Sequence, residues 1–164
     1  MLQKKICMLG AFGVGKTSLV RRYVQSIFSE TYLTTVGVKI DKKTVTVGTQ
    51  PVLMLLWDIA GEDDVSPIRT SYLRGAAGYF LIADGTRAET LEVASSIQSR
   101  VASEIGPVPF LILLNKADLQ ESWEISGEPV QQLEKGGWRI LRTSAKTGQG
   151  VEDAFQELAQ RIVG

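Results

Sequence analysis

The chain has 164 residues, of which 44% are hydrophobic and 22% charged, so we expect one globular domain with a sizeable core. Its 18 basic and 18 acidic residues give a formal net charge of zero, which provides no strong field for nucleic acid or anionic membrane. The chain contains no histidine, which excludes histidine triads, histidine general bases and histidine metal sites.

The single cysteine, Cys7, falls in the first predicted strand, where we expect a buried thiol typical of a reducing compartment. No apolar run is long enough for a signal peptide or a membrane span,. The last residues offer no cysteine for prenylation,. We therefore expect a cytoplasmic chain without an intrinsic membrane anchor, which reaches a membrane only through a missing tail or a partner.

Strand and helix patterns alternate along the whole chain. In chain order they predict a strand at 2–9, a helix at 16–25, strands at 36–47 and 52–58, a weak helix at 64–74, a strand at 78–83, a helix at 88–104, a strand at 110–114, a helix at 128–134, a strand at 138–141 and a helix at 151–163,. The short link at 47–51 favours an antiparallel hairpin. The alternation predicts an α/β fold with a mainly parallel sheet, which binds ligands beyond the carboxyl ends of its strands.

A phosphate-binding pattern, G-x-x-x-x-G-K-[ST], runs from Gly10 to Thr17 between the first strand and the first helix. Its backbone amides are expected to surround phosphates at a helix N-terminus, where free N–H groups favour anions. Lys16 would reach the β- and γ-phosphate oxygens, and the Thr17 hydroxyl would bind Mg²⁺. The remaining residues of the predicted cradle are Gly13, Val14, Gly15 and Ser18.

Asn115-Lys-Ala-Asp118 follows the apolar strand at 110–114. A carboxylate at Asp118 can accept hydrogen bonds from N1–H and the N2 amino group of guanine, a donor pair that adenine lacks. A site built around buried polar partners can reject the wrong base by roughly 10⁴–10⁵-fold, because that base would leave the Asp118 carboxylate unpaired. The Lys116 stem would cover one face of the ring, and Asn115 would bind back to the phosphate loop.

Two further motifs follow strands. Thr143-Ser144-Ala145-Lys146 comes after the last strand, where the Ala145 N–H would reach the guanine carbonyl oxygen. Asp58-Ile-Ala-Gly61-Glu62 comes after the strand at 52–58. Asp58 is placed to hold Mg²⁺ through water, and Gly61 lets its own N–H approach the γ-phosphate.

These motifs, in this order, resemble a small GTPase of the Ras superfamily, nearest its Rab-like branch. The resemblance covers the whole chain and rests on GAFGVGKTS, FSETYLTTVGVKI, WDIAGE, YLRGAAGYFLIAD, NKAD and TSAKTG. It implies a six-stranded sheet with one antiparallel strand, helices on both faces, and one G domain over residues 1–164. It implies binding of GTP or GDP with Mg²⁺, hydrolysis of GTP, and a monomer that signals to effectors and regulators through switch I (29–37) and switch II (60–74).

The same resemblance assigns roles to residues that the motif chemistry described above does not cover. Phe28 resembles the aromatic residue that packs against guanine. Thr35 resembles the threonine that binds Mg²⁺ and the γ-phosphate in the GTP state. Apolar contact to a partner would come from Val36, Val38 and Trp57, although a tryptophan at this position is more often part of the core.

Two residues depart from the family pattern. Glu62 replaces the glutamine that orients the attacking water. A carboxylate can accept a hydrogen bond from that water but cannot donate one to the transition state. Alternatively, Glu62 acts as a base. Phe12 replaces a small residue, and either crowds the γ-phosphate or blocks an arginine finger. We therefore expect slow hydrolysis by a regulatory switch. A pseudo-GTPase that holds nucleotide without turnover is the alternative, and a P-loop enzyme that uses ATP is disfavoured by Asp118.

Overall fold

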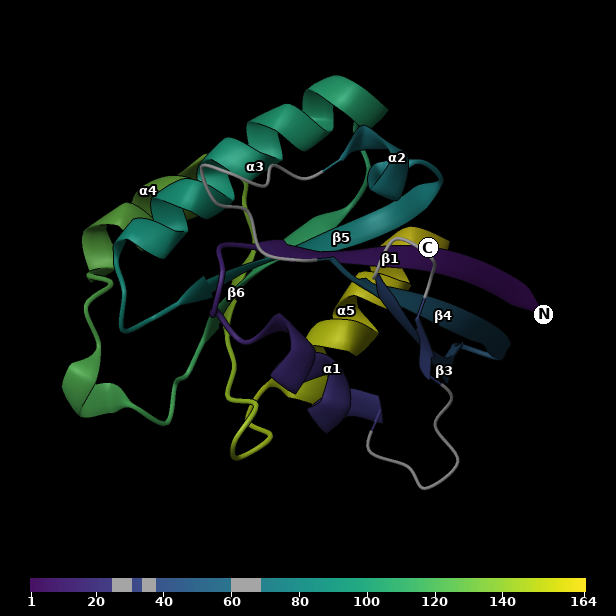
Figure 1. Ribbon diagram of the computed structural model, residues 1–164, viewed down its shortest axis with the longest axis horizontal. Helices are drawn as coiled ribbons and strands as arrows, with labels where there is room; N and C mark the ends of the chain where they lie inside the picture. Colours follow the sequence, from purple (N-terminus) through teal and green to yellow (C-terminus); the bar gives the residue numbers. More distant parts are fainter. Residues whose placement is uncertain (25–30, 34–37, 60–68) are drawn as a thin grey trace.

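One mixed sheet lies between two layers of helices (Figure 1). The fold comes from a computed structural model that describes residues 1–24, 31–33, 38–59 and 69–164, with the backbone alone at 31–33. The strand order is β2-β3-β4-β1-β5-β6-β7. The strands are β1 (Leu2–Gly10), β2 (Thr31–Leu33), β3 (Lys39–Val47), β4 (Gln50–Asp58), β5 (Ala76–Asp84), β6 (Phe110–Asn115) and β7 (Ile140–Arg142).

Helices cover both faces of this sheet. In Figure 1, α3 and α4 lie on one side of it, and α1 and α5 on the other. The helices are α1 (Lys16–Val24), α2 (Thr70–Leu73), α3 (Glu89–Ile105), α4 (Gly127–Lys135) and α5 (Val151–Val163), with a short 3₁₀ turn, η1 (Gln120–Ser122). Ser126 occupies the N-cap position of α4, but its side chain makes no capping hydrogen bond.

The predicted fold class is confirmed, with one addition. β1 pairs in parallel with β4 and β5, β5 with β6, and β6 with β7. The predicted hairpin pairs β3 with β4, and Gly48 takes a φ of 62° in its turn, a conformation that glycine adopts without steric cost. The addition is β2, a three-residue edge strand antiparallel to β3, so the described residues form a sheet of seven strands where six were expected.

Several element boundaries differ from those expected. α2 covers Thr70–Leu73 where a helix at 64–74 was predicted, and β3 begins at Lys39 where a strand from 36 was predicted. Residues 25–30, 34–37 and 60–68 lie outside the described part, so positions 64–68 of the predicted helix and 36–37 of the predicted strand are not tested. β7 is displaced by one to two residues from the predicted 138–141.

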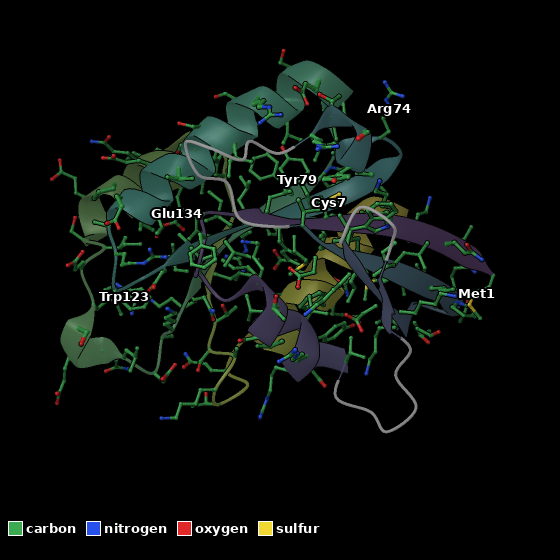
Figure 2. The ribbon with its side chains drawn as sticks, viewed as in Figure 1. Met1, Cys7, Arg74, Tyr79, Trp123 and Glu134 are labelled. Carbon is green, nitrogen blue, oxygen red and sulfur yellow. The ribbon has the colours of Figure 1, made fainter. Side chains whose placement is uncertain are left out.

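The sheet separates two apolar cores. On the α1 and α5 side, Phe155 stacks on Tyr23 with ring centroids 3.9 Å apart and packs obliquely on Phe80. On the α3 side, Cys7 and Tyr79 are paired positions of β1 and β5, and both lie in the interior (Figure 2). Burial raises the pKa of the Cys7 thiol to about 12, so the cysteine is an inert core residue, as expected.

This topology places the chemistry at one edge. The parallel strands β1, β4, β5 and β6 end at Gly10, Asp58, Asp84 and Asn115. Asp84 and Asn115 are paired across β5 and β6. Because the carboxyl ends of parallel strands meet on one side of the sheet, the loops that follow them form a common site.

Candidate nucleotide-binding site

The loop between β1 and α1 forms one side of a hollow of about 510 Å³. The lining residues are Phe12, Gly13, Gly15, Lys16, Thr17, Ser18, Lys39, Asp58, Ile59 and Lys116. Most of the residues predicted to hold phosphate and metal are therefore brought together. Lys39 and Ile59 were not predicted as site residues, although both lie within motif segments of the sequence.

Lys16 is a buried cation in the lining of this hollow. Its ammonium donates to the backbone carbonyls of Ala11 (3.1 Å) and Gly10 (3.3 Å). Burial lowers the pKa of Lys16 to about 8, and the nearby Asp58 carboxylate only partly opposes this. A buried ammonium held by neutral carbonyls is incompletely compensated, so an anion that enters the hollow stabilises its charged form.

Glycine is required at position 15 of the loop. Gly15 has a φ of 103°, and a Cβ there would collide with the side-chain amide of Asn115. That buried amide donates to the Val14 carbonyl at 3.0 Å, and its oxygen accepts from the Thr143 hydroxyl at 3.2 Å. The predicted contact between Asn115 and the phosphate loop is present.

Thr17 and Asp58 bring a hydroxyl oxygen and a carboxylate into contact in the lining of the hollow. The Thr17 hydroxyl donates to Asp58 Oδ2 at 2.5 Å, so residues 41 positions apart lie in contact. A hydroxyl and a carboxylate are hard oxygen ligands that suit Mg²⁺, which keeps several waters in such sites. Within the described ranges, no cluster of three or more Asp, Glu, Cys or His side chains could hold a metal.

A second hollow of about 360 Å³ adjoins the first. Its lining residues are Gly15, Ser18, Asn115, Lys116, Asp118, Leu119, Ala145 and Lys146. Asp118 Oδ1 accepts the hydroxyl proton of the buried Ser144 at 2.7 Å. Ser144 therefore fixes the orientation of the carboxylate, a role that the sequence motif did not reveal; Leu119 was not predicted either.

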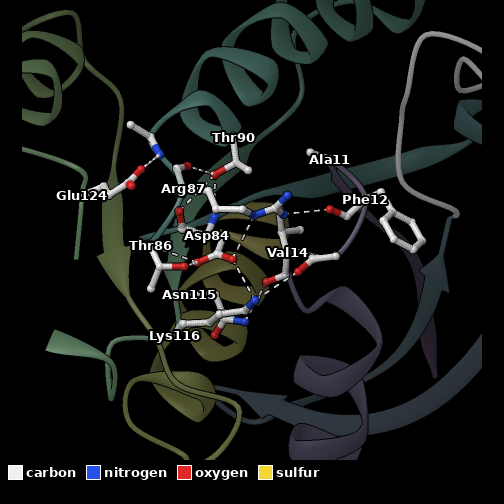
Figure 3. Close-up of polar contacts among 12 residues, drawn as sticks. Ala11, Phe12, Val14, Asp84, Thr86, Arg87, Thr90, Asn115, Lys116 and Glu124 are labelled. Atoms are coloured by element: carbon white, nitrogen blue, oxygen red, sulfur yellow. Dashed lines mark hydrogen bonds and ion pairs between the residues drawn. The ribbon is translucent and has the colours of Figure 1, made fainter. Parts of the chain in front are cut away.

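Lys116 stands where the two hollows meet. It lines both of them, and its ammonium lies 2.7 Å from Asp84 Oδ2 and 3.2 Å from the Gly13 carbonyl (Figure 3). Its φ of 69° is left-handed, which is uncommon for a residue other than glycine,. Backbone strain of this kind persists where surrounding contacts impose it, and it is often found at functional sites.

Some predicted residues are not tested. Phe28, Thr35, Gly61 and Glu62 lie outside the described residues. Asp84 and Arg87 were not predicted as site residues, although both contact Lys116 or the phosphate loop. Asp84 ends β5 on the edge shared by the other motifs, a signal that could have identified it.

The comparisons with known proteins agree with this geometry. A model of the Ras family matches residues 5–164. The chain is 32% identical to the Ras-related protein Rab-13 of Bos taurus over 161 residues, which cover 97% of this chain and 79% of the relative. It is 34% identical to the Ras-related protein Rab5 of Nicotiana tabacum over 163 residues, 98% of this chain and 82% of the relative. With its sheet, its phosphate loop and these relatives, the chain belongs to the Ras family, as a Rab-like small GTPase.

Proposed function

We propose that this chain is one G domain, a guanine-nucleotide switch that binds GTP or GDP with Mg²⁺ and hydrolyses GTP slowly. The observation that carries the proposal is the pair of adjoining hollows, which share Gly15, Ser18 and Lys116. The first is lined by the buried Lys16 cation and by residues of the phosphate loop, and the second by the oriented Asp118 carboxylate. A purine nucleotide has the same division into an anionic tail and a base.

Asp118 selects the base in this proposal. Ser144 holds one of its carboxylate oxygens, so the group is presented in a fixed orientation to the N1–H and N2 amino group of guanine. The Lys116 stem and Leu119 give the hollow an apolar side for the ring,. Ala145 and Lys146 also line this hollow, and the Ala145 N–H is the proposed donor to the guanine carbonyl.

The phosphate loop holds the polyphosphate. Lys16 supplies charge, and the amides of Gly13, Val14 and Gly15 supply hydrogen bonds at the N-terminus of α1,. Thr17 and Asp58, with Thr35, are the proposed residues for Mg²⁺. When bound, Mg²⁺ would neutralise negative charge on the phosphates. Thr35 and Gly61 would contact the γ-phosphate, so its loss would release both switch segments and any effector or regulator bound there.

Glu62 is the reason to expect slow hydrolysis. A carboxylate at the position of the usual glutamine cannot donate a hydrogen bond to the transition state. The negative charge of phosphate would also disfavour ionisation of a carboxyl group beside it. The same substitution keeps a second function open, a module that binds guanine nucleotide without turnover. Release of phosphate from bound GTP separates the two.

The expectation that Val38 offers apolar contact to a partner is wrong. It is buried in the core on the α3 side, so it offers no surface to a partner. Trp57 is half-buried, with the Lys5 ammonium 3.6 Å from its ring centroid. Within the described residues no helix combines the length and apolarity needed to cross a membrane. We propose a cytoplasmic monomer whose partners bind at the switch segments.

The first test is identification of the nucleotide that copurifies with the full chain, followed by competition between GTP and ATP. We expect GDP or GTP, and displacement by GTP but not by ATP. Asp118→Ala should lose this preference while Lys16→Ala loses binding of both. Equal uptake of ATP and GTP by the unaltered protein would contradict guanine recognition.

The second test is single-turnover hydrolysis of bound GTP by the unaltered protein and by Glu62→Gln. We expect slow phosphate release that Glu62→Gln accelerates. Fast release that slows on this substitution would mean that Glu62 acts as a base. No release from either protein would favour the module without turnover.

A further inference from the structure

A buried carboxylate at the end of β5 pairs with two cations. Asp84 is 1% exposed, and its Oδ2 lies 2.7 Å from the Lys116 ammonium and 3.2 Å from Arg87 Nε. Its Oδ1 accepts from the Thr86 amide and hydroxyl at 2.8 and 2.6 Å. Burial alone would raise the pKa of this carboxyl, but hydrogen bonds from Lys116 and Thr86 outweigh it and hold the pKa below its ordinary value. Asp84 is therefore ionised at neutral pH and fixes both cations.

Both cations hold the backbone of the phosphate loop. Arg87 Nη2 donates to the Phe12 carbonyl at 2.8 Å, and the Lys116 ammonium donates to the Gly13 carbonyl at 3.2 Å (Figure 3). With the bond from Asn115 to Val14, three successive carbonyls of the loop are each held by a side chain from the ends of β5 and β6. Arg87 is the one of these three side chains that belongs to none of the predicted motifs.

Holding a carbonyl also orients the next amide. The Phe12–Gly13 peptide is trans, so its C=O and N–H point in opposite directions across one rigid plane. Arg87 binds the carbonyl side of this peptide, so the Gly13 N–H points away from Arg87. Gly13 lines the phosphate hollow, and Arg87 is absent from its lining residues. The hydrogen bond from Arg87 therefore holds the phosphate loop from outside the hollow.

Residues 12 and 13 need such a restraint. The Phe12 side chain is 75% exposed and anchors its backbone poorly. Gly13, with a φ of 76°, has the widest conformational freedom of any residue type. Without a fixed carbonyl, this peptide would exchange between orientations, and its N–H would be presented to phosphate only part of the time.

We propose that Arg87, anchored on Asp84, is a positioning residue that holds the Phe12–Gly13 peptide with its N–H toward bound phosphate. The inference rests on the proposed binding of nucleotide. It concerns the phosphate half of the site and predicts no effect on recognition of the base.

The side chain can be altered without disturbing the local turn. The backbone bonds from Arg87 N to Asp84 O (2.9 Å) and from Thr90 N to Arg87 O (3.0 Å) do not depend on the guanidinium. Arg87→Met keeps the stem and removes every donor. Arg87→Lys keeps the charge and one donor group. Arg139→Met is the matched control, because Arg139 is also part-exposed and ion-paired, with Glu157 at 3.1 Å, but lies outside both hollows.

The experiment measures dissociation of fluorescent GDP from the full chain, and competition by GDP and by guanosine at equilibrium. A hydrogen bond with a charged donor predicts that Arg87→Met releases GDP about 10-fold faster. Arg87→Lys should recover part of this loss, and Arg139→Met should match the unaltered protein. Affinity for guanosine, which has no phosphate, should not change in Arg87→Met.

Two outcomes would overturn the inference. One is release of GDP at the unaltered rate from Arg87→Met. The other is an equal loss of affinity for GDP and guanosine with a lowered unfolding midpoint, which would make Arg87 a general structural residue. Failure of the unaltered protein itself to bind GDP would instead overturn the proposed function and, with it, this inference.

Discussion

Asn115→Ala tests how the two halves of the site are joined. The Asn115 side chain is buried at the end of β6, donates to the Val14 carbonyl at 3.0 Å and accepts from the Thr143 hydroxyl at 3.2 Å. Alanine removes both bonds and opens space beside the phosphate loop. The change should therefore reduce both the stability of the fold and the affinity for nucleotide.

The expected loss in the free energy of unfolding follows from these two hydrogen bonds. Each contributes about 1 kcal/mol net, and a buried polar group left without its partner costs about 1–3 kcal/mol more. Because water can enter beside an open hollow and replace part of this loss, we expect the free energy of unfolding to fall by about 2–4 kcal/mol. If half of that acts on the loop's bound conformation, GDP release accelerates about 5- to 30-fold, since 1.4 kcal/mol is a factor of ten.

Urea unfolding of the nucleotide-free protein and dissociation of fluorescent GDP are the two assays. Thr143→Val is the matched comparison, because it removes the Thr143 hydroxyl but keeps the bond from Asn115 to Val14. It should lower the free energy of unfolding by about 1 kcal/mol and accelerate GDP release less than Asn115→Ala does. Equal acceleration by both variants, or unchanged release from Asn115→Ala, would refute the idea that Asn115 holds the loop.

Three other predictions concern stability and reactivity. Cys7, whose thiol pKa is raised to about 12 by burial, should not react with a chromogenic disulfide reagent at pH 8 until urea unfolds the chain; reaction of the native protein would contradict its burial. Phe155→Ala removes a fully buried ring stacked on Tyr23 and should lower the free energy of unfolding by about 3–5 kcal/mol, measured by urea titration; a loss below 1 kcal/mol would mean that the core collapses into the space. Asp84→Asn should be less stable than the unaltered protein at neutral pH. The folded pKa of Asp84 lies below its ordinary 3.8, so its contribution to the free energy of unfolding is present above about pH 4 and is lost as pH falls through the folded pKa. The urea midpoints of Asp84→Asn and the unaltered protein should therefore converge in acid. A difference between the midpoints that stays constant with pH would exclude ionisation of Asp84 as the cause.

The sequence predicted the parts of this fold that depend on local pattern. Continuous apolar runs identified the buried strands, and the turn at Gly48 identified the hairpin of β3 and β4. Each motif follows a strand, which was enough to place Lys16, Asp58 and Asp118 along one edge. The alternating pattern could not predict β2, because a three-residue edge strand has too few positions to show a period.

Contacts between distant segments were predicted only where a known motif specified them. The bond from Asn115 to the phosphate loop was predicted, whereas the bond from Ser144 to Asp118 was not. Arg87 and Phe12 are 75 residues apart, and an arginine after a strand is usually a solvated surface residue. Its role depends on how β5 and β1 are paired, which periodicity does not contain.

Phe12 shows how the fold changes the meaning of a sequence departure. Its side chain is 75% exposed, lines the rim of the phosphate hollow, and in Figure 3 points away from Asp84 and Lys116. An exposed ring at a rim has room to move aside, which favours interference with an incoming partner over crowding of bound phosphate. Phe12→Ala is a better test than glycine, because alanine does not add backbone freedom. We expect intrinsic single-turnover hydrolysis to change by less than about 3-fold, equivalent to 0.7 kcal/mol. Acceleration of 10-fold or more would show that the ring crowds the γ-phosphate after all.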